Sequence, residues 1–387
     1  MKIAKSVNRL GTEAVYNIFA KTKKLIKEGK EIIDLSLGQS DFKSPQHAVD
    51  AAIKALKDGH HGYTLPNGII ECREAVSRKI KNLYKANIEP ERIIIMPGGK
   101  PTMHYAITFF GEADAEIVYP DPGFPIYESM INFTGAKAVS YNMTENKDFS
   151  INPDKILSLI NEKTRLLILN NPHNPTGGFT EKNTIDKLVN GLKDFPNLAI
   201  LSDEVYDRLI FDNKEIPTLL NYPDLYGRLI ILNGWSKTYA MTGWRLGWSV
   251  WPEQLIDHVF KFCVNSHSCV NTPAQYGAIA ALDGPENHLR DMMKEFNVRR
   301  KLIVEGLRSL KGVECSLPGG SFFAFPNVKK TGMNGEEFTE KCLKEAGVAM
   351  IPGTAFGKYA KYNVRFNFAT SKENISKAIE KIDKILK

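Results

Sequence analysis

Five short apolar runs divide the middle of the chain, and polar or glycine-rich residues follow each of them. The runs are RIIIM (92–96), AEIVY (115–119), RLLIL (165–169), LAIL (198–201) and RLIIL (228–232). Short apolar runs that alternate with helical stretches are typical of strands buried on both faces of a parallel sheet. Ligands of such sheets bind beyond the carboxyl ends of the strands. The residues that follow each run are therefore the candidates for function.

Amphipathic helices are expected near both ends of the chain. The first spans residues 12–28 and ends at Gly29. The second covers residues 370–387, and Thr370 and Glu373 are expected to form a capping box at its start. The 387 residues suffice for one large or two medium domains.

Composition excludes several classes of protein. The hydrophobic content of 43% and charged content of 25% are ordinary for a globular protein. The net charge of +7 comes largely from lysines spaced as solvated helix faces, without interleaved aromatic residues, so we expect no nucleic-acid partner. We find no signal-peptide core and no apolar run of membrane-spanning length, which favours a cytoplasmic protein. The five cysteines show no CxxC pair or zinc-like spacing, so we expect free thiols and no metal site.

The first three runs end in a glycine loop, an aromatic pair and an amide. PGGKP places Gly99 and Lys100 in a loop before a helix, where a phosphate could bind, although a plain turn explains the loop equally well. In PDPGFPIY, Phe124 and Tyr127 could present a ring to a flat ligand or simply pack on the core. In NNPHNPTGG, Asn174 lies in a rigid polar turn and could aim its amide at a ligand oxygen.

The last two runs end in acids, a phenol and two cations. Asp203 and Tyr206 lie in SDEVY, where a helix cap is the alternative role for the acid. GWSKTYAMTGWRLGW contains Lys237 and Arg245 but no acid. Buried cations need partners, so this stretch predicts an anionic ligand.

One ligand would use all five strand ends: an aromatic heterocycle that carries a phosphate, a basic ring nitrogen, a phenolic oxygen and an aldehyde. A lysine can form an imine with the aldehyde, a carboxylate can keep the ring nitrogen protonated, and an arginine and a helix N-terminus can bind the phosphate. Pyridoxal 5'-phosphate has all of these groups.

Several motifs occur in the order found in one enzyme family: DLSLGQSDFKSP, YTLPNGI, NPHNPTG, SDEVY, SKTYAMTGWRLG, PGTAFG and VRFNFA. With these motifs, the chain resembles the class I (fold-type I) pyridoxal-phosphate-dependent aminotransferases, including the aspartate and aromatic enzymes, over essentially its whole length.

The resemblance implies roles for individual residues. Lys237 matches the Schiff-base lysine, and Asp203 and Tyr206 match the other catalytic positions. The cofactor positions are Tyr63, Gly99, Lys100, Phe124, Asn174, Asp203, Tyr206, Ser236, Lys237 and Arg245. The substrate positions are Gly38, Phe124, Asn174 and Arg365. Because Tyr63 matches a tyrosine that reaches the phosphate of the other subunit, a homodimer is implied.

Three positions depart from the commoner family pattern. Gly234 stands where many relatives have serine, so Ser236 is a candidate to grip the phosphate instead. Trp235 is bulkier than the usual residue, and GQSDF replaces Gly-Glu-Pro-Asp-Phe.

The resemblance also implies the fold, which is of the α/β class. A large domain with a mixed, mostly parallel seven-stranded sheet is expected over residues 46–285. Residues 1–45 and 286–387 are expected to form a smaller α+β domain that includes an N-terminal arm.

The implied activity moves the amino group of an L-amino acid to a 2-oxo acid, with 2-oxoglutarate as the expected acceptor, by a ping-pong mechanism. Aspartate or a related or aromatic amino acid is the expected donor. The alternative enzyme is a lyase of the same fold that eliminates at Cβ or Cγ. A regulator that senses the cofactor is not expected, because it would need an N-terminal DNA-binding domain and too few residues precede LSLGQSDF for one. His104, His267 and Lys100 are candidates for the cation that binds a second substrate carboxylate, because NSHSCVNTPAQ contains no arginine.

Overall fold

The computed structural model describes residues 1–11, 14–144, 146 and 148–387. The α-helices are α1 (Ala14–Lys27), α2 (Gln46–Lys57), α3 (Ile70–Tyr84), α4 (Lys100–Phe110), α5 (Ile126–Thr134), α6 (Pro153–Leu159), α7 (Lys182–Gly191), α8 (Ile256–Ser266), α9 (Thr272–Asp283), α10 (Asn287–Ser309), α11 (Gly335–Lys341) and α12 (Lys372–Leu386). The strands are β1 (Ile33–Asp34), β2 (Ile93–Met96), β3 (Glu116–Asp121), β4 (Lys137–Asn142), β5 (Thr164–Asn170), β6 (Ala199–Asp203), β7 (Leu229–Gly234), β8 (Gly247–Val250), β9 (Phe323–Ala324), β10 (Val348–Ala349), β11 (Ile351–Pro352) and β12 (Val364–Asn367).

Seven strands form the main sheet, in the order β2-β8-β7-β6-β5-β3-β4. Strand β8 runs antiparallel to both of its neighbours, and the other neighbouring pairs are parallel. The predicted α/β fold with a mixed, mostly parallel seven-stranded sheet is therefore confirmed. The five apolar runs form β2, β3, β5, β6 and β7, which all point the same way, so their carboxyl ends meet at one edge.

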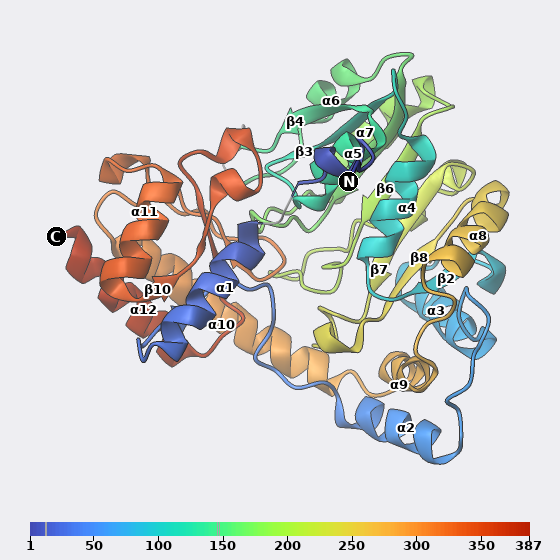
Figure 1. Cartoon of the computed structure of the whole chain (residues 1–387), viewed down its shortest axis with the longest axis horizontal. Helices are drawn as coiled ribbons and strands as arrows, with labels where there is room; N and C mark the ends of the chain where they lie inside the picture. Colours follow the sequence, from blue (N-terminus) through green and yellow to red (C-terminus); the bar gives the residue numbers. More distant parts are fainter. Residues whose placement is uncertain (12–13, 145, 147) are drawn as a thin grey trace.

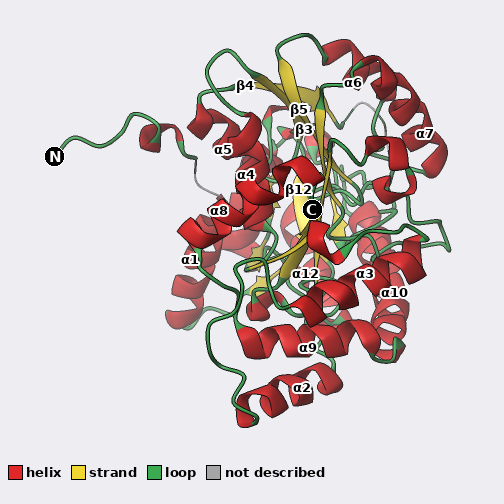
Figure 2. Cartoon of the chain, turned by 90° about the vertical axis from the view of Figure 1, so that its right-hand side faces the viewer, coloured by secondary structure: helices red, strands yellow, loops and turns green. Residues whose placement is uncertain are grey.

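Helices cover both faces of this sheet, which explains why the runs are apolar throughout. Alternate residues of one strand point to opposite faces. On β5, Leu166 and Ile168 join the core beneath α4, α5 and α8, whereas Leu167 and Leu169 join the core that includes residues of α3, α6, α7 and α9. Figure 2 shows the sheet between α4, α5 and α8 on one side and α3 and α7 on the other.

The segment around β1 packs with the part of the chain after α10, beside the main sheet. Strand β1 pairs in parallel with β10, with Ile33 opposite Val348. A three-stranded antiparallel sheet has the order β11-β12-β9. Helix α1 contacts β11 of this C-terminal part, and Figure 1 shows α1 on the same side of the molecule as α11 and α12. The domain boundaries at residues 45/46 and 285/286 stay a prediction.

Two expectations about the terminal helices need comment. The first helix is observed as α1, Ala14–Lys27, whereas the predicted start at residues 12 and 13 lies outside the described residues. The capping box at Thr370 was wrong by one residue. Helix α12 is capped by Ser371, whose side chain accepts from the backbone N–H of Asn374, while the Thr370 hydroxyl accepts from the side-chain amide of Asn374 instead.

The five cysteines are free thiols, and all except Cys269 are buried. In the part of the chain that the structure describes, no helix has both the length and the apolar character needed to cross a membrane.

Candidate active site

A cavity of about 440 Å³ opens at the carboxyl edge of the main sheet. The predicted cofactor and substrate residues, with the exception of Tyr63, line it: Gly38, Gly99, Lys100, Phe124, Asn174, Asp203, Tyr206, Ser236, Lys237, Arg245 and Arg365. These residues come from five strand ends of the main sheet, from the segment after β1 and from β12. The fold thus brings into one place groups that the sequence separates by more than 300 residues.

Lys237 follows β7 and reaches across to the segment after β1. Its Nζ donates a hydrogen bond of 2.7 Å to the carbonyl of Gly38. Burial, followed by the charges of Arg365 and Arg245, lowers the pKa of the Lys237 amine from 10.5 to about 8, and Asp203 opposes this shift. The amine is therefore neutral in a larger fraction of molecules near neutral pH than an ordinary lysine is.

Asp203 is the last residue of β6, and its carboxylate is buried together with the side chain of Tyr127. Tyr127 on α5 donates a hydrogen bond of 2.6 Å from its hydroxyl to Asp203 Oδ2, and the backbone N–H of Val205 donates to Oδ1. Burial raises the pKa of the Asp203 carboxyl to about 6, although both hydrogen bonds lower it. A cationic ligand group next to this buried carboxylate would favour its ionised form.

Tyr206 follows Asp203 after β6, Asn174 follows the neighbouring strand β5, and both line the cavity with Asp203. Burial raises the pKa of the Tyr206 phenol, so this group stays protonated. The ring of Tyr206 packs edge-on against Phe323. The backbone N–H of Asn174 donates to the side chain of Asn170, the last residue of β5, which fixes the turn that carries Asn174.

A cradle for an anion lies at the start of α4. Gly98 has a φ of +91°, and a Cβ on it would lie 2.2 Å from Arg245 Nη2, so only glycine lets the guanidinium come this close. Arg245 donates from Nη1 to the carbonyl of Thr242 and from Nη2 to that of Pro97. The N-terminus of an 11-residue helix, a glycine loop and an arginine together suit a phosphate.

Arg365, on β12 of the three-stranded sheet, also lines the cavity. It is 3% exposed, and its Nη1 donates to Asn174 Oδ1 at 2.9 Å while its Nη2 donates to the carbonyl of Ser36 at 2.7 Å. Its guanidinium carbon lies 4.4 Å from the centroid of the Phe323 ring. This planar cation is held in place beside the cavity, where a carboxylate could bind to it in a bidentate manner.

The structure places three candidates elsewhere. Tyr63 does not line the cavity and is 93% exposed. His104 and His267 line a neighbouring cavity of about 710 Å³, which shares Lys100 with the first one. Of the three candidate side-chain cations, only Lys100 therefore faces the site, and its Nζ lies 5.5 Å from the centroid of the Phe124 ring.

Sequence reasoning missed three contributors to the site. Tyr127, considered as a ring for a flat ligand, is fully buried and uses its hydroxyl on Asp203 instead. Asn170 lines the cavity, and its position directly after an apolar run was a signal that could have identified it. Asn367 holds the segment around Gly38 through its side chain, and no local pattern marks it.

The departures from the family pattern have structural reasons at two positions. A Cβ on Gly234 would lie 2.9 Å from the Gly247 Cα of β8, which leaves no room for serine. Trp235 is fully buried, and its indole N–H donates to the carbonyl of Ala278 on α9. Ser236 lines the cavity.

Comparisons with known proteins agree with the site. A family model described as "Aminotransferase class I and II" matches residues 30–382. A "Probable aspartate aminotransferase" of Methanocaldococcus jannaschii is 38% identical over 92% of this chain and 93% of its own. An "Aspartate aminotransferase" of Pyrococcus horikoshii is 36% identical over 99% and 97% of the two chains.

Solved structures show the same fold. The aspartate aminotransferase from Rhizobium meliloti superimposes with a TM-score of 0.95 at 28% identity, over 100% of this chain and 99% of that one. The names of these relatives favour amino-group transfer over the elimination considered as an alternative. The chain is therefore an enzyme that transfers amino groups, and it belongs to the class I and II aminotransferase family.

Proposed function

We propose that this aminotransferase uses pyridoxal 5'-phosphate to move the amino group of L-aspartate to 2-oxoglutarate. The observation that carries the proposal is the convergence of Lys237, Asp203 and Arg365 on one cavity. Lys237 would be the base, Asp203 the anion that pairs with the ring nitrogen, and Arg365 the cation that binds the substrate carboxylate. A lyase of the same fold would share the first two.

The residues at the sheet edge fit the cofactor. Gly98, Gly99 and the N-terminus of α4 would hold the phosphate together with Arg245. The Phe124 ring would pack on the pyridine, and Asp203 would receive the N–H of the ring nitrogen. Tyr206 and Asn174 would donate to the phenolic oxygen. Burial raises the pKa of Asp203 to about 6 against the hydrogen bonds from Tyr127 and Val205, so Asp203 can act as an anion above this pH.

The chemistry supplied by the bound cofactor is an electron sink for a carbanion at the substrate α-carbon. Lys237 removes the proton from that carbon, for which its amine must be neutral, and the neighbouring arginines favour the neutral form. Asp203 would stabilise positive charge on the ring nitrogen. Arg365 would bind the α-carboxylate and so hold the α-carbon in the cavity that Lys237 also lines.

Lys100 supports aspartate as the donor. Of the candidate cations from the sequence, it is the one that lines the site cavity, next to Phe124. An ammonium there could bind the second carboxylate of aspartate or 2-oxoglutarate. The names of the two relatives reported above, both aspartate aminotransferases, support the same donor.

A donor panel tests the substrate. With the purified protein, added cofactor and 2-oxoglutarate, we expect aspartate to give oxaloacetate and glutamate faster than aromatic or aliphatic donors. Lys100→Gln should raise KM for aspartate about tenfold or more through loss of a charge-assisted contact and change KM for alanine little. Lys261→Gln is the matched control, because Lys261 lines only the neighbouring cavity. Release of ammonia without glutamate would support the lyase instead.

We further propose a cytoplasmic homodimer with shared sites. Tyr63 is 93% exposed in the single chain and lies outside its own cavity. An exposed tyrosine on a loop with Leu65, which is 59% exposed, suits contact with a second copy.

A further inference from the structure

The segment that crosses the site after β1 is held along its length by β12. The backbone N–H of Asn367 donates to the carbonyl of Leu35, and that of Asp41 donates to the carbonyl of Ala369. Between these points the chain turns at Gly38, where the N–H of Gln39 donates back to the carbonyl of Leu37 at 2.8 Å.

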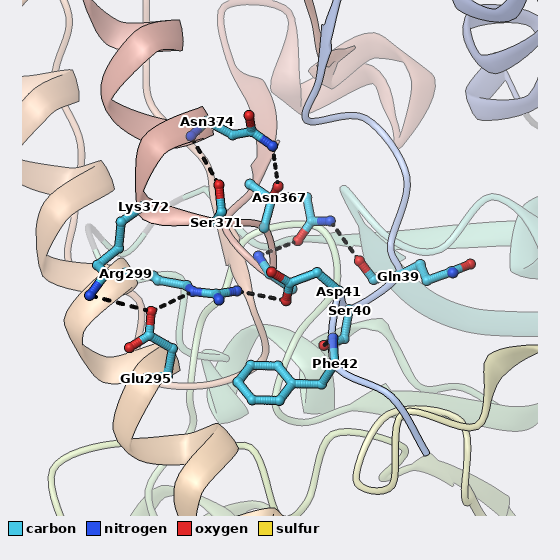
Figure 3. Close-up of polar contacts among 12 residues, drawn as sticks. Gln39, Ser40, Asp41, Phe42, Glu295, Arg299, Asn367, Ser371, Lys372 and Asn374 are labelled. Atoms are coloured by element: carbon cyan, nitrogen blue, oxygen red, sulfur yellow. Dashed lines mark hydrogen bonds and ion pairs between the residues drawn. The ribbon is translucent and has the colours of Figure 1, made fainter.

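The side chain of Asn367 holds both carbonyls that flank Gly38. Its Nδ2 donates to the carbonyl of Leu37 at 2.5 Å and to that of Gln39 at 3.1 Å. Its Oδ1 accepts from the backbone N–H of Ala369 at 2.8 Å, which fixes the orientation of the amide. Asn367 is 4% exposed. Figure 3 shows its side chain directed at Gln39.

The far end of the segment is anchored by an ion-pair cluster. Arg299 on α10 contacts Asp41 at 2.7 Å and Glu295 at 3.0 Å, and its guanidinium carbon lies 5.3 Å from the centroid of the Phe42 ring. Figure 3 shows Arg299 between Glu295 and Asp41. The segment therefore cannot shift without breaking contacts to both β12 and α10.

Of the four backbone carbonyls from Ser36 to Gln39, that of Gly38 accepts a hydrogen bond from Lys237. The carbonyl of Ser36 accepts from Arg365, and those of Leu37 and Gln39 accept from Asn367. The carbonyl of Gly38 accepts from Lys237 Nζ at 2.7 Å. A Cβ on Gly38 would lie 3.2 Å from Phe323 Cζ, so the ring of Phe323 also packs closely against the turn.

We propose that Asn367 is a positioning residue, which holds the Gly38 peptide so that its carbonyl receives and orients the Lys237 amine for proton transfer. A neutral amine has one lone pair, and donating one N–H to a fixed carbonyl restricts the direction of that lone pair. The inference rests on the proposed role of Lys237 as the base. Asn367 itself touches neither substrate nor cofactor.

The first test compares two buried asparagines near the end of the chain. Asn367→Ala should lower kcat by about 10- to 100-fold, because small displacements of a reacting group are costly. The primary deuterium isotope effect with an amino acid deuterated at Cα should rise, since proton transfer becomes slower relative to the other steps. Asn363→Ala is the control: Asn363 is 5% exposed and donates to the carbonyl of Phe325, away from the cavity. It should keep both values.

The second test needs no cofactor. Hydrogen exchange of the cofactor-free protein should be faster in peptides covering residues 36–42 for Asn367→Ala than for the wild type, and unchanged there for Asn363→Ala. If Asn367→Ala does not fold, Asn367→Ser, which retains a short polar group, takes its place in both experiments.

Two results would overturn the proposal. One is a loss of kcat that merely follows the number of active sites, with an unchanged isotope effect. The other is an unchanged rate of exchange over residues 36–42. Failure of the proposed function can be distinguished from failure of the role of Asn367. In the first case the wild-type protein itself would not transfer amino groups from aspartate to 2-oxoglutarate.

Discussion

Burial has the largest effect on the pKa of Lys237; the charges of Arg365 and Arg245 lower it further, and Asp203 opposes them. We expect an acylating reagent to label Lys237 in the cofactor-free protein with half-maximal rate near pH 8, instead of the ordinary 10.5. The neutral amine is the reactive form, so labelling rises with pH. Mass spectrometry of the Lys237 peptide over a pH series measures this.

Arg365→Met provides a check on the cause. Removing a positive charge stabilises the ammonium form, so the midpoint for Lys237 should move to higher pH. If the midpoint stays in place, Arg365 does not influence the amine, and burial and Arg245 account for the lowered pKa.

Tyr127 controls Asp203 through one hydrogen bond. Tyr127→Phe removes a donor that stabilises the carboxylate, so the pKa of Asp203 should rise above about 6. The acid limb of the kcat profile should then move to higher pH, with a loss of about 1 kcal/mol of stability for the hydrogen bond. Tyr141→Phe, a buried tyrosine whose hydroxyl donates to the carbonyl of Ile168, should leave the profile unchanged.

At the scale of elements, β7 and β8 pair through two glycines that leave no room for a side chain. Gly234 pairs with Gly247, and a Cβ on Gly234 would lie 2.9 Å from the Cα of its partner and 3.0 Å from the Leu246 carbonyl oxygen. Gly234→Ala should therefore cost about 1–3 kcal/mol, the usual range for overpacking, and lower Tm. Gly227→Ala is the control, because no atom of the residues that the structure describes lies within 4 Å of the added Cβ. Equal Tm values for the two variants would show that the strands separate easily.

Strands buried on both faces were predictable from the sequence, and two others were not. β2, β3, β5, β6 and β7 are buried at nearly every position, so their runs are apolar without interruption. β4 lies at the edge of the sheet with only one buried residue, Tyr141, and β8 has just four residues, GWSV. Neither has a hydrophobic period that distinguishes it from a loop. The start of α12 was misplaced because Thr370 and Ser371 are both good caps.

At the scale of the whole molecule, parallel strands explain why the site was predictable in outline. Since their carboxyl ends share one edge, residues after separate runs had to meet there. Contacts between distant parts were not predictable in this way. Arg365 meets Asn174 across 191 positions, and Asn367 meets Leu37 across 330. Nothing in the local sequence specifies how the small sheet docks against the large one, so the role of Asn367 required the structure.

The whole-molecule prediction concerns the second copy of the chain. If Tyr63 serves the partner's site, Tyr63→Phe should weaken cofactor binding by about 1.5–3 kcal/mol, as for a lost hydrogen bond to a charged group. Lys237→Ala should abolish turnover at its own site. A mixed dimer of the two variants combines both lesions in one site and leaves the other site whole.

Mixing the two variants after reversible dissociation therefore has a defined outcome. Random pairing makes half of the dimers mixed, and each mixed dimer has one whole site, so about one site in four should recover wild-type kcat and cofactor affinity. Activity is measured at a cofactor concentration too low to load the Tyr63→Phe homodimer. Incubating each variant alone through the same cycle is the control. If subunit exchange is complete, as shown by mass-tagged chains, and no activity returns, Tyr63 acts within its own chain or not at all.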